Sequence, residues 1–199
     1  SELTDASSTA EILWRLTDHY GKQAFTKPIA EALYTGILTD TGGFRYPRTD
    51  AELLCMVAEL LEVGVDPTYV YEKIYNRGAL NRTRLLGRAL VSLRVFHHGR
   101  LCIMTVTQEM LREMQASEDL TEGFVEHTLS LDGVKVGVLI VEMADVVKMS
   151  FRSKDQIPAN TFAEFFNGGG HLNAAGARTK DYTLEEVIDK IVEMVASHV

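Results

Sequence analysis

Apolar residues recur every three or four positions through roughly the first 75 residues, a spacing typical of helices that bury one face. A capping box at Ser8–Glu11 precedes the first apolar run, and Pro28 suits the first turn of a second helix. The second helix runs toward Asp40, and the glycine pair 42–43 ends it. We therefore expect two helices before residue 44.

Two more helices are expected before residue 77. Thr49–Glu52 is read as a capping box for a third helix, and Gly64 as its end. Asp66 and Pro67 are suited to the cap and the first turn of a fourth helix. A fifth helical stretch covers about residues 82–96.

The pattern changes near His97-His98, where β-branched and apolar runs replace the helical spacing. Strands are expected at residues 101–106, 134–141 and 146–151, and helices at 108–115, at 162–166 and after the cap residue Thr183. Glycines 168–170 indicate a loop, and a helix near Leu172 would add its dipole to that loop.

These elements predict an α/β fold. A mostly helical part, residues 1–77, is expected to be joined by a connector helix, residues 78–99, to a smaller mixed-sheet α/β part, residues 100–199.

The chain has 199 residues and a formal net charge of −8 at pH 7. This balance argues against duplex DNA as a partner, because duplex binding uses many Lys and Arg contacts to phosphates, but it leaves room for a small phosphorylated ligand. No apolar run reaches the roughly 20 residues of a membrane span. Cys55 and Cys102 lie in apolar patterns and are expected to be buried free thiols, which favours a cytoplasmic location.

Asp40 is the first residue with candidate chemistry. It lies at the end of an apolar helix between Thr39 and Thr41, whose hydroxyls could hydrogen-bond the carboxylate or the backbone. Neighbouring glycines permit close approach of a metal or phosphate. A hard divalent cation prefers such oxygen ligands. One carboxylate is not a metal site, however, and an ordinary polar helix end explains the same residues.

The second candidate is the segment Asn167–Gly176, which contains Gly168, Gly169, Gly170 and His171. Consecutive glycines can turn their N–H groups toward one anion, and His171 can donate a hydrogen bond or positive charge to a phosphate. The alternative is a flexible loop followed by a packed helix of small residues.

Arg152 is the third candidate, at the end of a predicted strand. Its guanidinium could bind phosphate or carboxylate with two hydrogen bonds, which Lys154 would do less specifically. An exposed arginine at a strand end is the alternative.

Together these segments resemble the DHH phosphoesterase superfamily. Residues 33–42 look like its fourth metal motif, and residues 167–176 look like the signature of the DHH-associated C-terminal domain. Arg152 falls where that domain places a substrate-binding arginine. The chain is most similar to the nanoRNase type, which acts as an oligoribonuclease and as a phosphatase of 3′-phosphoadenosine 5′-phosphate.

The resemblance implies a Mn²⁺-dependent phosphodiesterase or phosphatase with two lobes. Residues 1–77 would be the C-terminal part of the DHH catalytic domain, with Asp40 as one ligand of a centre that holds two Mn²⁺ ions. The second lobe would hold a short single-stranded RNA or a small phosphorylated nucleotide. Its matching substrate-binding positions are Arg152, Gly168, Gly169, Gly170 and His171.

The sequence departs from this pattern because it contains neither an Asp-x-Asp nor an Asp-His-His motif. The chain alone is therefore expected to be inactive or nearly so. A non-catalytic nucleotide-binding module, a cyclic-dinucleotide phosphodiesterase and an exopolyphosphatase-like enzyme are the alternatives, and a homodimer is left open.

Overall fold

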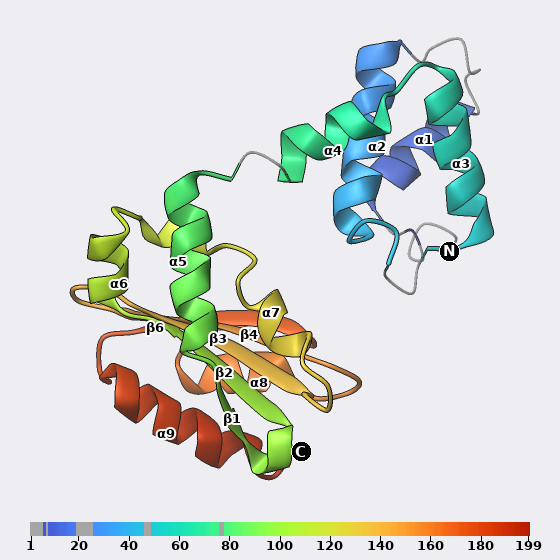
Figure 1. The fold of residues 1–199 in the computed structure, drawn as a ribbon. Coiled ribbons are helices and arrows are strands. Elements are labelled where there is room, and N and C mark those ends of the chain that lie inside the picture. Colours follow the sequence, from blue (N-terminus) through green and yellow to red (C-terminus); the bar gives the residue numbers. More distant parts are fainter. Residues whose placement is uncertain (1–5, 7, 19–25, 46–48, 76–77) are drawn as a thin grey trace. The chain divides into compact units, whose positions relative to one another are not determined.

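A computed structural model describes residues 6, 8–18, 26–45, 49–75 and 78–199. The chain divides into two compact units, Ser1–Arg77 and Gly78–Val199. Figure 1 shows helices in the first unit, and a sheet with helices on both faces in the second.

The described residues of the first unit form four helices: α1 (Thr9–Asp18), α2 (Lys27–Asp40), α3 (Ala51–Glu62) and α4 (Pro67–Tyr75). They enclose a core built around Ile37, Met56 and Leu60, which are almost completely buried. Ser8 caps α1, because its hydroxyl accepts a hydrogen bond from the Glu11 N–H at 3.0 Å. The four predicted helices are therefore confirmed.

Two details in α3 differ from expectation. Its cap is Asp50 rather than Thr49, since an Asp50 carboxylate oxygen accepts the Leu53 N–H at 2.9 Å. Cys55 was expected to be buried but is exposed, because Leu53 and Met56 lie on the buried face of α3 and Cys55 lies off it. Cys102 is buried as expected.

The second unit is built on a six-stranded mixed sheet with the order β1-β2-β3-β4-β6-β5. Its strands are β1 (Arg94–Phe96), β2 (Leu101–Val106), β3 (Val136–Glu142), β4 (Val147–Ser153), β5 (Gly169–His171) and β6 (Ala174–Thr179). Only β2 and β3 run parallel, and the other neighbouring strands are antiparallel. The predicted mixed sheet is thus confirmed.

The remaining elements of this unit are helical. They are α5 (Leu80–Val91), η3 (His97–Gly99), α6 (Gln108–Glu113), η4 (Glu118–Thr121), α7 (Glu126–Leu129), α8 (Ala159–Phe165) and α9 (Leu184–Val195). A complete capping box begins α9, in which the Thr183 hydroxyl and the Glu186 carboxylate bind each other's backbone N–H groups.

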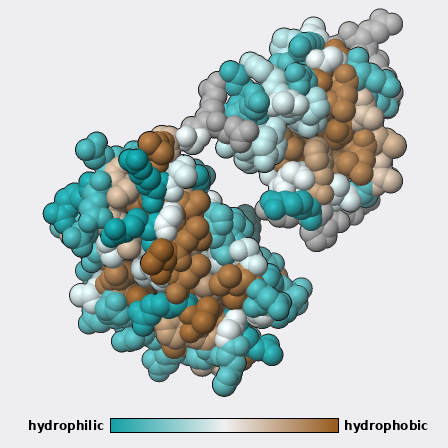
Figure 2. All heavy atoms as spheres, in the orientation of Figure 1, coloured by the Kyte–Doolittle hydropathy of each residue, from teal (hydrophilic) through white to brown (hydrophobic). Residues whose placement is uncertain are grey.

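Helix α5 ends at Val91, so the expected helix over residues 82–96 was too long, and its last residues form the edge strand β1. Leu85 and Ala89 are completely buried in one cluster with Met104 and Leu139 of the sheet. The stretch that was read as a connector therefore packs as part of the second unit. Figure 2 shows apolar surface along the α5 side of this unit, where Val91 is exposed.

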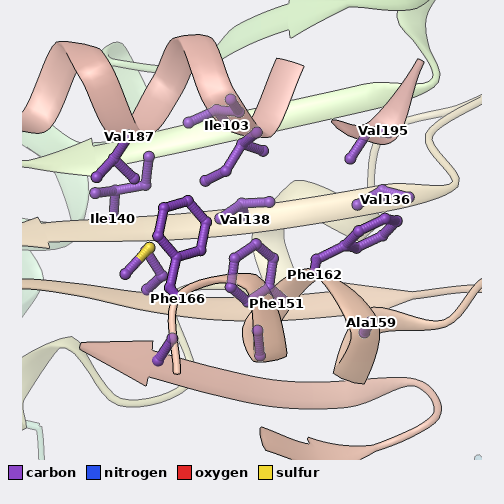
Figure 3. Packing of buried hydrophobic residues seen from close by; sticks show 14 of the residues in the cluster. Ile103, Val136, Val138, Ile140, Phe151, Ala159, Phe162, Phe166, Val187 and Val195 are labelled. Atoms are coloured by element: carbon purple, nitrogen blue, oxygen red, sulfur yellow. The ribbon is translucent and has the colours of Figure 1, made fainter. Parts of the chain in front are cut away.

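Buried and partly buried side chains alternate strictly along β4, so successive residues point to opposite faces of the sheet. Val147, Met149 and Phe151 enter the core under α8 and α9, where Phe151 packs against Phe162 and Phe166 (Figure 3). The intervening residues of β4 point to the opposite face.

The structure corrects the reading of residues 168–176. The loop expected at Gly168–Gly170 is largely strand β5, and the helix expected near Leu172 is strand β6, which pairs with β5 as a hairpin. Small residues are needed because the strands approach closely. A Cβ on Gly168 would lie 2.5 Å from the Cβ of Ala177, and one on Gly170 would lie 2.5 Å from the Ala174 carbonyl oxygen.

Candidate functional site

Most of the candidate residues of the second unit lie on one face of the sheet, on the part that helices α5 and α7 leave open. Helices α5 and α7 cover this face over β2 and β3, where Met104 and Leu139 are buried. Over β4 and β6 the same face carries polar side chains. They are Lys148, Ser150 and Arg152 on β4 and Arg178 on β6, with Gly176 between them.

Arg152 is held on this face by two acceptors. Its Nε donates to a Glu126 carboxylate oxygen at 2.9 Å, and its Nη1 donates to the Phe151 carbonyl at 3.0 Å. Within residues 78–199, which the structure describes without a gap, Nη2 has no hydrogen-bond partner. The guanidinium is thus oriented, and it keeps N–H groups available for an anion.

His171 lies in the same lateral row as Arg152. His171 pairs with Ala174, and Ala174 pairs with Arg152, so all three side chains point to one face. Two strand spacings separate the Cα atoms of His171 and Arg152, which is about 10 Å. Ala174 adds only a methyl group between them, so a small anion can reach both side chains.

Gly169 and Gly170 are exposed on the edge strand β5. The outer side of an edge strand leaves backbone N–H groups without a sheet partner. Gly170 has a φ of 150°, which few side-chain-bearing residues adopt. These features are compatible with backbone donors at an anion site, although the geometry is a hairpin and not a helix N-terminus.

Asp40 is exposed at the C-terminal end of α2 in the first unit. The neighbouring hydroxyls do not bind its carboxylate. Thr39 donates to the Thr35 carbonyl at 3.0 Å, and Thr41 donates to the Ile37 carbonyl at 2.7 Å. Of the two alternatives, the hydroxyls therefore bind the backbone and not the carboxylate, because helical backbone carbonyls lie within reach of both.

Among the residues that the structure describes, no group of three or more His, Cys, Asp or Glu side chains could hold a metal ion. Asp40 therefore does not assemble a metal centre with other described residues.

The sequence reading missed Glu126, Lys148 and Arg178. Lys148 could have been found from the alternation of apolar and polar residues along 147–153, which puts it on the same face as Arg152. Glu126 comes from the short helix α7, which is distant in sequence, and no local pattern links it to Arg152.

A comparison with protein families matches residues 100–199 to the DHHA1 domain. The chain belongs to the DHH family of phosphoesterases. The chain also matches the solved structure of an exopolyphosphatase-related protein from Bacteroides fragilis. That match has a TM-score of 0.91 and 35% identity, and covers 98% of this chain and 58% of the other.

Two curated relatives are each named bifunctional oligoribonuclease and PAP phosphatase NrnA. The protein from Thermus thermophilus is 34% identical over 95% of this chain and 56% of its own length. The protein from Bacillus subtilis is 28% identical over 87% of this chain and 55% of its own length. The DHH-family chain thus spans about half the length of these relatives. Among its described helices, none is long and apolar enough to cross a membrane.

Proposed function

We propose that this DHH-family chain is the substrate-holding part of a phosphoesterase that hydrolyses short oligoribonucleotides and small nucleotides such as 3′-phosphoadenosine 5′-phosphate. The similarity to the two NrnA proteins supports the substrate class. The row of Arg152, Ala174 and His171 carries the proposal, because it aligns two phosphate-binding side chains across a small residue.

In this proposal Arg152 grips a phosphate through the N–H groups that Glu126 and the Phe151 carbonyl leave available. His171 donates to the same phosphate from the neighbouring edge strand. The Gly168 N–H already donates to the Ala163 carbonyl at 2.9 Å, so the backbone donors for the ligand come from the edge-strand residues Gly169 and Gly170. The lack of side chains at Gly168–Gly170 lets the ligand approach closely.

The complete enzyme is proposed to act in the cytoplasm and to use two Mn²⁺ ions, which would activate a water and neutralise charge on the phosphate. Asp40 is proposed as one carboxylate ligand of this centre. The described residues do not make such a centre by themselves, so no catalytic step is assigned to them.

The lack of a metal-binding cluster among the described residues favours a second candidate, a nucleotide-binding module without catalysis. Calorimetric titration with adenosine monophosphate, with and without Mn²⁺, tests whether Asp40 contributes to a metal site in this chain. Tighter binding with Mn²⁺ would argue against the module, while equal binding is what both candidates predict for this chain alone.

In both cases Arg152→Ala and His171→Ala should each weaken binding at least tenfold. Arg112→Ala, which removes an exposed arginine from α6, is the matched control and should bind like the parent. If both Arg152→Ala and His171→Ala kept the affinity of the parent, the proposed role of these residues in phosphate binding would be refuted.

A further inference from the structure

Lys148 and Arg178 lie directly opposite each other on β4 and β6, on the same open face as Arg152. Like charges in such a pair repel each other. Glu118 lies between them, with carboxylate oxygens 2.7 Å from Arg178 Nη2 and 3.9 Å from Lys148 Nζ. One carboxylate cannot neutralise two cations, so this cluster keeps a net positive charge inside a chain whose net charge is −8.

A hollow of about 420 Å³ opens beside this pair. Its lining includes Lys148, Ser150, Asn167, Gly168, Gly176 and Arg178. No Asp or Glu side chain of residues 78–199, all of which the structure describes, lines this hollow. It therefore offers cations, a hydroxyl and an amide to a ligand, which is a set suited to an anion.

A second hollow, of about 300 Å³, runs along β4, where Lys148, Ser150 and Arg152 line it. Glu118, Asp119 and Glu122 also line it, so this hollow is less favourable to an anion than the first, which has no carboxylate in its lining. An anion drawn to Lys148 is thereby directed toward β6 and Arg178.

The spacing along β4 sets what kind of anion fits. Lys148 and Arg152 are four residues apart on one strand, so their Cα atoms are separated by about 13 Å. Ser150 lies midway and points to the same face. One strand repeat of two residues is comparable in length to one nucleotide unit of an extended single strand. Two repeats therefore match two nucleotide steps.

We infer that Lys148 and Arg178 form a second phosphate subsite, which rests on the proposed function. It takes the phosphate two nucleotides along a single-stranded oligoribonucleotide from the phosphate held at Arg152. Ser150 offers its hydroxyl to the unit between them. A mononucleotide reaches only Arg152, whereas a trinucleotide reaches both subsites.

The test is a binding titration of the 199-residue chain with 5′-phosphorylated oligoadenylates of one and three nucleotides, without Mn²⁺. The trinucleotide should bind several-fold more tightly than the mononucleotide. Lys148→Gln and Arg178→Gln should each remove most of this gain and leave mononucleotide affinity unchanged. Each should also flatten the slope of log affinity against log salt for the trinucleotide by about 0.7.

Lys190→Gln is the matched control, because Lys190 lies on α9, which covers the opposite face of the sheet. It should change neither affinity nor salt slope. Melting temperatures of all three variants show whether each is folded. A purely structural role for Lys148 and Arg178 would move the melting temperature without a length-dependent loss of affinity.

The second subsite would be overturned if the parent bound both ligands with equal affinity. It would also be overturned if Lys190→Gln lost as much affinity for the trinucleotide as Lys148→Gln. Failure of the proposed function looks different. In that case the mononucleotide itself would not bind, or Arg152→Ala would bind it as well as the parent.

Discussion

Gly168→Ala tests whether the glycine that precedes β5 is required by close packing against β6. The new Cβ would lie 2.5 Å from the Ala177 Cβ and 2.7 Å from the Ala177 Cα, and it would also overlap the Gly176 carbonyl oxygen. Two of these three neighbours are backbone atoms, so no rotamer change relieves the overlap and β5 must move away from β6.

Overpacking of this kind costs about 1–3 kcal/mol. The lower entropy of the unfolded chain with alanine offsets about 0.4–1 kcal/mol of that cost. Taking the middle of each range, the net loss is about 1.3 kcal/mol. For a unit of this size, such a loss lowers the melting temperature by roughly 4–8 °C.

Gly169→Ala is the matched control, since a Cβ there meets no atom within 4 Å and the φ of Gly169 lies outside the left-handed region. Its stability should stay within about 0.5 kcal/mol of the parent. Urea unfolding followed by circular dichroism measures both variants. Equal stability of Gly168→Ala and Gly169→Ala would refute the packing explanation.

Three further predictions concern other parts of the molecule. In the native protein a thiol reagent at pH 8 should modify Cys55 and spare Cys102, because burial raises the pKa of Cys102 to about 11; two reactive thiols before denaturant is added would contradict this. Lys135 donates a hydrogen bond to Asp155, and this bond together with the lysine charge lowers the pKa of the Asp155 carboxyl. The pair therefore stabilises the folded protein above the unfolded-state pKa of about 3.9. That stability is lost as the pH falls through the lower pKa of the folded state. Lys135→Met should therefore lose less stability than the parent when urea unfolding is compared at about pH 5 and pH 3, and an equal loss would argue against the pair. The 199-residue chain with Mn²⁺ should release nucleotides from a short oligoribonucleotide at no more than a trace rate, and turnover at ordinary enzymatic rates would overturn that expectation.

Local signals predicted most of the helices. Caps at Ser8 and Thr183 and the first-turn Pro67 act within three or four residues of themselves, so the sequence shows them directly. The alternation along β4 is an equally local signal of its two faces, but Lys148 was not predicted from it. The hairpin at Gly169–Thr179 escaped because small residues and glycines carry no clear periodicity, and its structure depends on pairing with β4.

By itself the sequence determined the α/β class and the order of most elements, and it predicted Arg152 and His171 as phosphate-binding residues. Only the tertiary structure decided which of those residues meet. The register of β4, β6 and β5 puts Arg152 and His171 in one row, and packing of α7 on the sheet brings Glu126 to Arg152 from 26 residues away. Strand pairing joins segments that are distant along the chain, so the composition of a phosphate site can be read locally, whereas its geometry depends on register.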